Sequence, residues 1–258
     1  MEAGPDNALT KAVRVLTALR TLSHGGSARE LATTTGVSRS TVQRILTTLE
    51  ATGMVIQDGL TQRYRVGPQA LLIGLGYNGA ANLLNEARPH MVALRDQTGE
   101  TVGLSVAAGN ARVFIDEVQS PHPLRFASEL GQMYPLWSGA NGRILLSAMN
   151  DEEIEHVLAS HEHDQAVHRP LSAEETRRRI REIRRAGHAM AADEAIDGVS
   201  SLAVPIHDGA HRVIAALSVS GPSERLTRDR MEATLSPLRT AGRAISARLG
   251  ASDIPAEG

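Results

Sequence analysis

Short polar and basic side chains gather at the front of one predicted helix, within the stretch GVSRSTVQRILTTLEATGMV that runs from Gly36 to Val55. Arginine can bind a guanine edge through two hydrogen bonds, and glutamine can bind adenine in the same way. Serine and threonine hydroxyls are short enough to approach phosphate oxygens closely. The front therefore holds residue types that contact duplex DNA: Ser38, Arg39, Ser40, Thr41, Gln43 and Arg44.

Three helices are predicted to position this front. The first covers residues 7–24, where leucine and valine recur at three-to-four spacing. The second begins at Ser27, which can form a capping box with Glu30. Ser38 is the expected N-cap of the third, whose apolar stripe consists of Val42, Ile45, Leu46 and Leu49. Two short helices joined by a glycine turn, the second with a basic front, are typical of a helix-turn-helix.

A β-hairpin is predicted directly after the third helix, from residues 54–57 and 62–66 around Asp58-Gly59. In that position it is the wing of a winged helix, so we expect residues 1–66 to form a DNA-binding domain. The alternative is a solvated face on a small helical bundle. The predicted DNA-binding residues are Ser27, Ser38, Arg39, Ser40, Thr41, Gln43, Arg44 and, on one face of the second wing strand, Arg63 and Arg65.

Residues 67–84 are apolar and rich in small side chains, and they contain the glycine pattern G-x-G-x-x-G from Gly74 to Gly79. A dinucleotide site would need a strand before this pattern and a helix after it. Residues 70–73 can be read as that strand, but no alternating parallel-strand pattern follows. We therefore predict a linker helix over residues 67–84.

The remaining residues, 85–258, are predicted to form an α+β domain with a mostly antiparallel sheet, because strands from both ends flank central helices. The predicted helices are residues 83–98, 139–149, 151–160, 172–186 and 227–249. The predicted strands are residues 101–107, 112–118, 124–128, 188–192, 201–207 and 212–220.

Few residues of this second domain are arranged for catalysis or metal binding. The histidines His156, His161, His163 and His168 cluster, but in a polar, loop-like stretch where solvated side chains are the favoured interpretation. The arginines of residues 177–185 alternate with glutamates, which favours a solvated helix face over a second DNA patch. Ser218 and Ser220 alternate along a strand without a partner base. We expect no catalytic residue, metal or cofactor.

Composition and charge exclude several classes of function, partner and location. The chain has no cysteine and 2% aromatic residues, which argues against disulfides and against stacking platforms for single-stranded nucleic acid. The sequence shows neither a membrane-length apolar run nor a signal peptide, so we expect a cytoplasmic location and no membrane partner. Residues 1–66 carry eight basic and five acidic residues, a net charge of +3 that leaves −5 for the rest. Only the first domain is therefore expected to meet a polyanion.

Along nearly its whole length the chain resembles the IclR family of bacterial transcriptional regulators. The resemblance is carried by ELATTTGVSRSTVQRILTTLEATGMV, RYRVGPQALLIG, TGETVGLSVAAGNARVFIDEVQS, PLRF, YPLWSGANGRILLSAM, SSLAVPIHD and AALSVSGPSERLT, in this order. It implies a winged helix-turn-helix, a linker helix and a GAF-like domain for effector binding and oligomerisation. It also implies a dimer, or a dimer of dimers, on a palindromic operator of double-stranded DNA.

The resemblance also implies a pocket for a small-molecule effector, such as a metabolite or organic acid. Its expected residues are Ala140, Asn141, Ser201, Ser218 and Ser220, with Leu124, Met133 and Trp137 as apolar walls. Ser201 stands where many members have cysteine, and Ala191 and Ala192 stand where some carboxylate sensors have aspartate. Gly139 and Arg143 replace a threonine or serine and a lysine that are common in the family.

The sequence therefore predicts a sequence-specific transcriptional regulator, a repressor, whose affinity for its operator is changed by an effector in the second domain. A constitutive architectural DNA-binding protein is one alternative. An enzyme domain fused to a DNA-binding head is the other.

Overall fold

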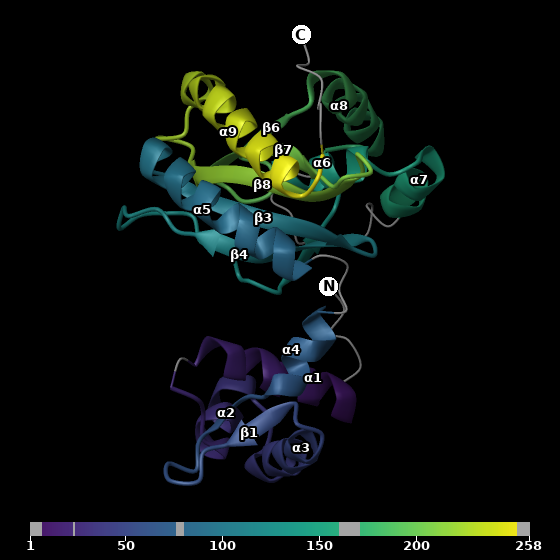
Figure 1. Cartoon of the computed structure of the whole chain (residues 1–258). Coiled ribbons are helices and arrows are strands. Elements are labelled where there is room, and N and C mark those ends of the chain that lie inside the picture. Colours follow the sequence, from purple (N-terminus) through teal and green to yellow (C-terminus); the bar gives the residue numbers. More distant parts are fainter. Residues whose placement is uncertain (1–6, 23, 76–79, 160–170, 252–258) are drawn as a thin grey trace. The chain divides into compact units, whose positions relative to one another are not determined.

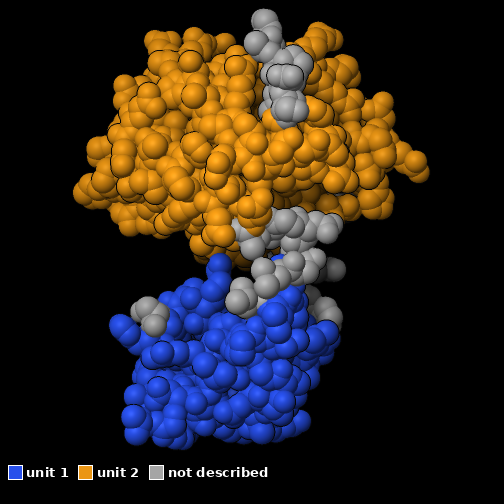
Figure 2. Space-filling view, viewed as in Figure 1, with its two compact units in different colours: residues 1–81 blue, residues 82–258 orange. Residues whose placement is uncertain are grey.

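The chain divides into two compact units, residues 1–81 and 82–258, which Figure 2 colours separately. The computed structural model describes residues 7–22, 24–75, 80–159 and 171–251. Each unit has its own core and is described by itself.

The first unit holds the three predicted helices and the hairpin. The elements are α1 (Ala8–Thr21), α2 (Ala28–Thr35), α3 (Arg39–Ala51), β1 (Val55–Gln57), β2 (Tyr64–Val66) and α4 (Pro68–Leu75) (Figure 1). Their core is built from residues of α1, α2, α3 and the hairpin, including Val15, Leu19, Leu31, Val42, Ile45, Leu46, Val55 and Tyr64. The predicted winged helix-turn-helix is confirmed.

Local capping fixes the turn between α2 and α3. The Ser27 hydroxyl accepts the Glu30 backbone N–H while the Glu30 carboxylate accepts the Ser27 N–H, so both halves of the predicted capping box are present. Gly36 ends α2 in the left-handed conformation, with φ of 68°, which glycine adopts without steric cost. Ser38 then caps α3. The two helices thus meet through a three-residue turn whose geometry is set by its own side chains.

The hairpin is attached to the loop that precedes α2. Its strands pair antiparallel from Val55 opposite Val66 to Gln57 opposite Tyr64. Tyr64 also bridges to Gly26 through backbone hydrogen bonds of 2.9 Å in both directions. The wing is therefore fixed to the helical part of the unit by its base.

The second unit is a six-stranded sheet covered by helices. The strands are β3 (Thr101–Ala108), β4 (Ala111–Val118), β5 (Met133–Pro135), β6 (Ala189–Ala192), β7 (Val199–His207) and β8 (Val213–Pro222). They lie in the order β5-β4-β3-β8-β7-β6, and each neighbouring pair is antiparallel. The helices are α5 (Ala80–Thr98), α6 (Gly139–Ser147), α7 (Asp151–Ala159), α8 (Ala173–Ala186) and α9 (Arg228–Arg248).

The two faces of this sheet carry different side chains. Figure 1 shows α5 and α9 across one face, where large aliphatic residues such as Leu202 and Val204 form the main core. The other face packs against α6, and there the strands present small residues such as Ala203 and Ala216, in a cluster that also includes residues of α7 and α8. Because side chains alternate between faces along a strand, Ser201 of β7 shares the α6 side with Ala203, and Ser218 and Ser220 of β8 share it with Ala216.

One predicted strand is wrong, and one strand was not predicted. Residues 124–128 form no strand, because the carbonyls of Leu124 and Phe126 accept hydrogen bonds from the side chains of Arg225 and Thr101 instead of a strand partner. The edge strand is β5, whose three residues end in a proline and give little periodicity.

The segment predicted as a linker begins with α4 and runs into α5, which starts at Ala80, three residues before the predicted start of that helix. Residues 70–73 lie within α4, which removes the strand that a dinucleotide site requires. Residues 76–79 of the glycine pattern lie outside the described residues.

Candidate DNA-binding and effector sites

The front of α3 is exposed over the residues predicted to contact DNA. Arg39, Ser40, Gln43 and Arg44 are exposed, while the opposite side of the helix buries Val42, Ile45 and Leu46 against α1 and α2. The buried stripe therefore fixes which side of α3 faces outward.

Some of the predicted contact residues also have local structural roles. The Ser38 hydroxyl accepts the Thr41 backbone N–H at 3.4 Å and lies 2.8 Å from the Thr41 hydroxyl. Ser27 caps α2 in the same way. Gln43 donates to the Tyr64 hydroxyl at 3.1 Å, which joins α3 to the wing. These side chains hold the first turns of α2 and α3 in place.

The two wing arginines lie in different environments. Arg63 is half-buried and donates to the Gly25 carbonyl at 2.8 Å and to the Glu30 carboxylate. The pKa of the Glu30 carboxyl is lowered, mainly by hydrogen bonds from Ser27 and to a smaller extent by the hydrogen bond from Arg63. Arg65 is exposed. Arg63 therefore ties the wing to α2, whereas Arg65 faces solvent.

In the second unit, polar side chains meet where α6 lies on the sheet. Asn141 at the start of α6 is 3% exposed and accepts a hydrogen bond from the Ser105 hydroxyl at 3.3 Å. On β8, the Ser218 hydroxyl donates to the Gly103 carbonyl at 3.3 Å. Ser201 lies opposite Ser220 in the pairing of β7 with β8. The sheet thus brings four of the predicted effector residues, Asn141, Ser201, Ser218 and Ser220, to one face.

The predicted apolar residues are distributed differently. Trp137 and Ala140 are buried, at 3% and 1% exposure, in the core under α6. Leu124 and Met133 are 70% and 52% exposed, because one lies in the loop that replaced the predicted strand and the other begins edge strand β5. Their role as apolar walls of the effector pocket stays a prediction.

Sequence reasoning missed Arg112, which lies on the same face of the sheet. It is 6% exposed, and its guanidinium carbon lies 5.0 Å from the ring centroids of both Phe114 and Tyr134. The signal available in the sequence was period-2 alternation along β4, which places residues 112 and 114 on one face. That alternation does not tell which face is buried.

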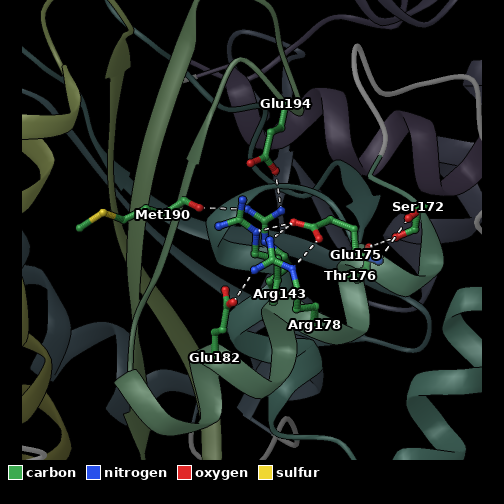
Figure 3. Close-up of polar contacts among 9 residues, drawn as sticks. Arg143, Ser172, Glu175, Thr176, Arg178, Glu182, Met190 and Glu194 are labelled. Carbon is green, nitrogen blue, oxygen red and sulfur yellow. Dashed lines mark hydrogen bonds and ion pairs between the residues drawn. The ribbon is translucent and has the colours of Figure 1, made fainter.

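A second missed group is the ion pair of Arg143 with Glu194. Figure 3 shows the Arg143 guanidinium between the Glu194 carboxylate and the Met190 carbonyl, to which it donates at 3.1 Å. A cavity of about 480 Å³ adjoins the pair beside edge strand β6. Ala191 and Ala192 also line this cavity.

Comparison with known proteins agrees with both domains. The profile of the IclR helix-turn-helix domain matches residues 8–59, and that of the bacterial transcriptional regulator IclR C-terminal domain matches residues 76–247. The chain belongs to the IclR family.

Three relatives of this IclR-family chain illustrate the match. The HTH-type transcriptional regulator KdgR of Escherichia coli is 30% identical over 88% of this chain and 86% of its own. The transcriptional repressor IclR of the same organism is 28% identical over 88% and 84%. An IclR homologue from Microbacterium hydrocarbonoxydans, solved in complex with 4-hydroxybenzoate, has the same fold, with a TM-score of 0.74, 24% identity and coverage of 95% and 100%.

The family assignment makes the protein a DNA-binding transcriptional regulator with an effector-binding C-terminal domain, and not an enzyme. In the described part of the chain, no helix is long and apolar enough to span a membrane. No group of three or more His, Asp or Glu side chains among the described residues is placed to hold a metal ion. Of the histidine cluster only His156 is described; His161, His163 and His168 lie outside the described residues.

The arginine-rich helix of this regulator is a solvated, ion-paired face, as predicted. Arg177 pairs with Glu155, and Arg178 pairs with both Glu175 and Glu182. The hydrogen bonds from Arg178 hold the pKa of the Glu175 carboxyl down at about 2. Glutamates thus neutralise much of the positive charge on α8.

Proposed function

We propose that this chain is a homo-oligomeric repressor that binds a palindromic operator through α3. An effector that binds the α6 side of the second unit lowers or raises the affinity for that operator. The observation that carries the proposal is the exposed front of α3 with Arg39, Ser40, Gln43 and Arg44, where neither arginine pairs with a carboxylate within the described residues. Repression is supported by the similarity to the transcriptional repressor IclR of E. coli.

The exposed front supports a division of labour in DNA recognition. Arg39 and Arg44 have free guanidinium forks for guanine edges, and the Gln43 amide, steadied by Tyr64, faces the same way. Ser27, Ser38, Ser40 and Thr41 offer hydroxyls to phosphates near the helix N-termini. Arg65 reaches for the backbone from the wing, while Arg63 holds the wing in position.

Two DNA-binding domains are needed to bind two half-sites whose centres lie about 34 Å apart, or a multiple of that spacing. This requirement supports a dimer or a dimer of dimers, working on the nucleoid in the bacterial cytoplasm. An effector can change operator affinity only if it binds one arrangement of the heads better than another. The buried polar face under α6 supports that role, because it carries Asn141, Ser201, Ser218 and Ser220 together.

The experiment is a gel-shift titration of the purified protein on its own upstream intergenic DNA with excess nonspecific competitor. We compare wild type, Arg39→Ala/Arg44→Ala, and a control with the same charge change on exposed α8 positions, Arg181→Ala/Arg185→Ala. The proposal expects a discrete shift that the first variant loses and the control keeps. Equal loss in both variants would instead favour a nonspecific architectural binder, whose affinity depends on total charge and salt.

A further inference from the structure

We propose that Tyr64 of the wing is a positioning residue for base recognition. Its hydroxyl holds the side-chain amide of Gln43, on the front of α3, in the orientation that binds an adenine edge in the major groove. The inference rests on the proposed function, in which α3 contacts the operator. It adds which base Gln43 selects and which residue outside α3 makes that selection possible.

Tyr64 has a fixed position at the base of the wing. Its side chain is 4% exposed and belongs to the core of the first unit. Its backbone pairs with Gln57 in the hairpin and exchanges two hydrogen bonds of 2.9 Å with Gly26, in the loop before α2. That loop packs closely on the strand, since a Cβ atom at Gly25 would lie 2.6 Å from the Tyr64 carbonyl oxygen. The phenol ring is therefore held from the core side and from both of its backbone neighbours.

The Tyr64 hydroxyl bonds one side chain of the front of α3. Gln43 donates to it from Nε2 at 3.1 Å. A hydroxyl on a buried ring is normally hydrogen-bonded, because leaving it unpaired is costly. Among the described residues, no other side chain of the front is hydrogen-bonded to an element beyond α3 and its N-cap. Gln43 is therefore the front residue whose orientation is set from outside its own helix.

The bond to Tyr64 leaves free the part of the amide that adenine requires. A glutamine amide has one carbonyl oxygen that accepts and two N–H groups that donate. Tyr64 takes one N–H, so Oε1 and the second N–H of Gln43 remain for DNA. Adenine presents a donor at N6 beside an acceptor at N7, which match this pair, whereas guanine presents two acceptors. The orientation seen here therefore favours adenine over guanine.

The contact with Tyr64 also reduces the entropy that Gln43 loses on binding. A long exposed side chain loses rotamer freedom when it binds a base, and one that is already held in the binding orientation loses less. Gln43 is neutral, so it contributes to the choice of base and not to the salt-dependent attraction between arginines and phosphates. Loss of the Tyr64 hydroxyl should therefore change the base preference at one position and leave the salt dependence unchanged.

The test uses the full-length protein and a DNA duplex that the wild-type protein selects from a random-sequence library. Competition gel shifts with single-base-pair variants of that duplex compare wild type, Gln43→Ala, Tyr64→Phe and the double variant. Tyr64→Phe removes the hydroxyl and keeps the ring in the core. The matched control is Thr52→Val, which removes a hydroxyl that bonds backbone carbonyls at the C-terminal end of α3.

Wild type should prefer adenine at one position of each half-site, and Gln43→Ala should lower that preference at least about 5-fold. Tyr64→Phe should lower the same preference by about 3-fold or more, with wild-type preferences at the other positions and a wild-type salt slope. In the Gln43→Ala background, Tyr64→Phe should have no further effect, because the hydroxyl acts through Gln43. Thr52→Val should show the preferences of wild type.

A second measurement follows Gln43 without DNA. The protein is labelled with ¹⁵N in its glutamine side chains, and the Gln43 amide resonance is assigned by its loss in Gln43→Ala. Its order parameter should fall in Tyr64→Phe and stay at the wild-type value in Thr52→Val, because the amide loses its partner only in the first variant. Thermal unfolding of the same samples shows that each variant is folded.

The inference is overturned if the base preferred at the Gln43-dependent position is not adenine, or if Tyr64→Phe keeps the full preference there. It is also overturned if Tyr64→Phe weakens every sequence equally, if its effect adds to that of Gln43→Ala, or if the order parameter of Gln43 does not change. These outcomes leave the proposed function intact as long as Arg39→Ala/Arg44→Ala loses the selected duplex. If wild type selects no sequence, or if that arginine variant keeps its affinity, the proposed function itself fails.

Discussion

The front of α3 and the α6 side of the sheet both present arginines, and they differ in their access to water. Arg39 and Arg44 are exposed, so hydration offsets the absence of a counter-charge until DNA arrives. Arg143 and Arg112 are 1% and 6% exposed, and among the described residues only Arg143 has a carboxylate beside it. An unpaired cation at the surface costs little stability, whereas an unpaired cation in the interior destabilises the fold.

The largest expected effect comes from breaking the buried pair. Glu194→Ala leaves the Arg143 charge buried without its carboxylate, so we expect the free energy of unfolding to fall by about 3–5 kcal/mol. Urea denaturation measures this loss. The matched variant is Asp151→Ala, whose partner Arg184 is 39% exposed; it should change the free energy by less than about 0.5 kcal/mol. Equal losses in the two variants would contradict the contrast between buried and exposed arginines.

The exposed region was predictable from sequence because its signals are local. The stripe of α3 repeats within one helix, and the cap residues Ser27 and Ser38 act within three positions. Residue type alone then identifies the outward face. The role of Arg63 was not predictable, because it depends on Gly25 and Glu30, more than thirty positions away.

The buried region needed the register of the sheet. Alternation along β8 predicted that Ser218 and Ser220 share a face, but not that Ser218 meets Gly103 there or that Ser105 meets Asn141. Arg112 became visible only once Tyr134 was placed opposite it by β5, a strand too short to predict. The pairing of strands that lie far apart in the sequence decides which polar residues of a sheet are buried. The periodicity of a single strand does not reveal that pairing.

The next effect concerns the α3 front itself. Arg44→Ala should weaken operator binding by about 1–3 kcal/mol and relax the preference at one base pair, if its fork grips a base edge. Its free energy of unfolding should match wild type, because the side chain is exposed. Competition gel shifts with operators mutated at single positions measure the preference. Arg65→Ala on the wing is the comparison: it should weaken all sequences alike and reduce the salt slope by about 1.

If Arg44→Ala lost the same affinity for every operator sequence, Arg44 would be assigned to a contact with the phosphate backbone. An unchanged affinity would show that α3 is not the element in the groove.

Arg112 should affect stability in the opposite direction from Glu194. Its Nε and Nη1 atoms are buried without a hydrogen-bond partner among the described residues. Arg112→Met removes this unpaired charge and keeps an apolar side chain among the rings, so the free energy of unfolding should rise by about 1–3 kcal/mol. Urea denaturation of wild type and variant measures the gain. A loss of stability would mean that the ring contacts with Phe114 and Tyr134 outweigh the cost of the buried charge.

The smallest effect separates capping from contact within the first unit. Ser27→Ala removes the hydroxyl that caps α2, so we expect the free energy of unfolding to fall by about 1 kcal/mol. Ser40 is exposed on the front of α3 and caps neither helix, so Ser40→Ala should leave stability unchanged and weaken operator binding only. Thermal unfolding and gel shift on the same preparations give both quantities. If the two variants lost stability equally, the exposed front of α3 would contribute to the fold as well as to recognition, and the contrast with the buried arginines would be weaker than we argue.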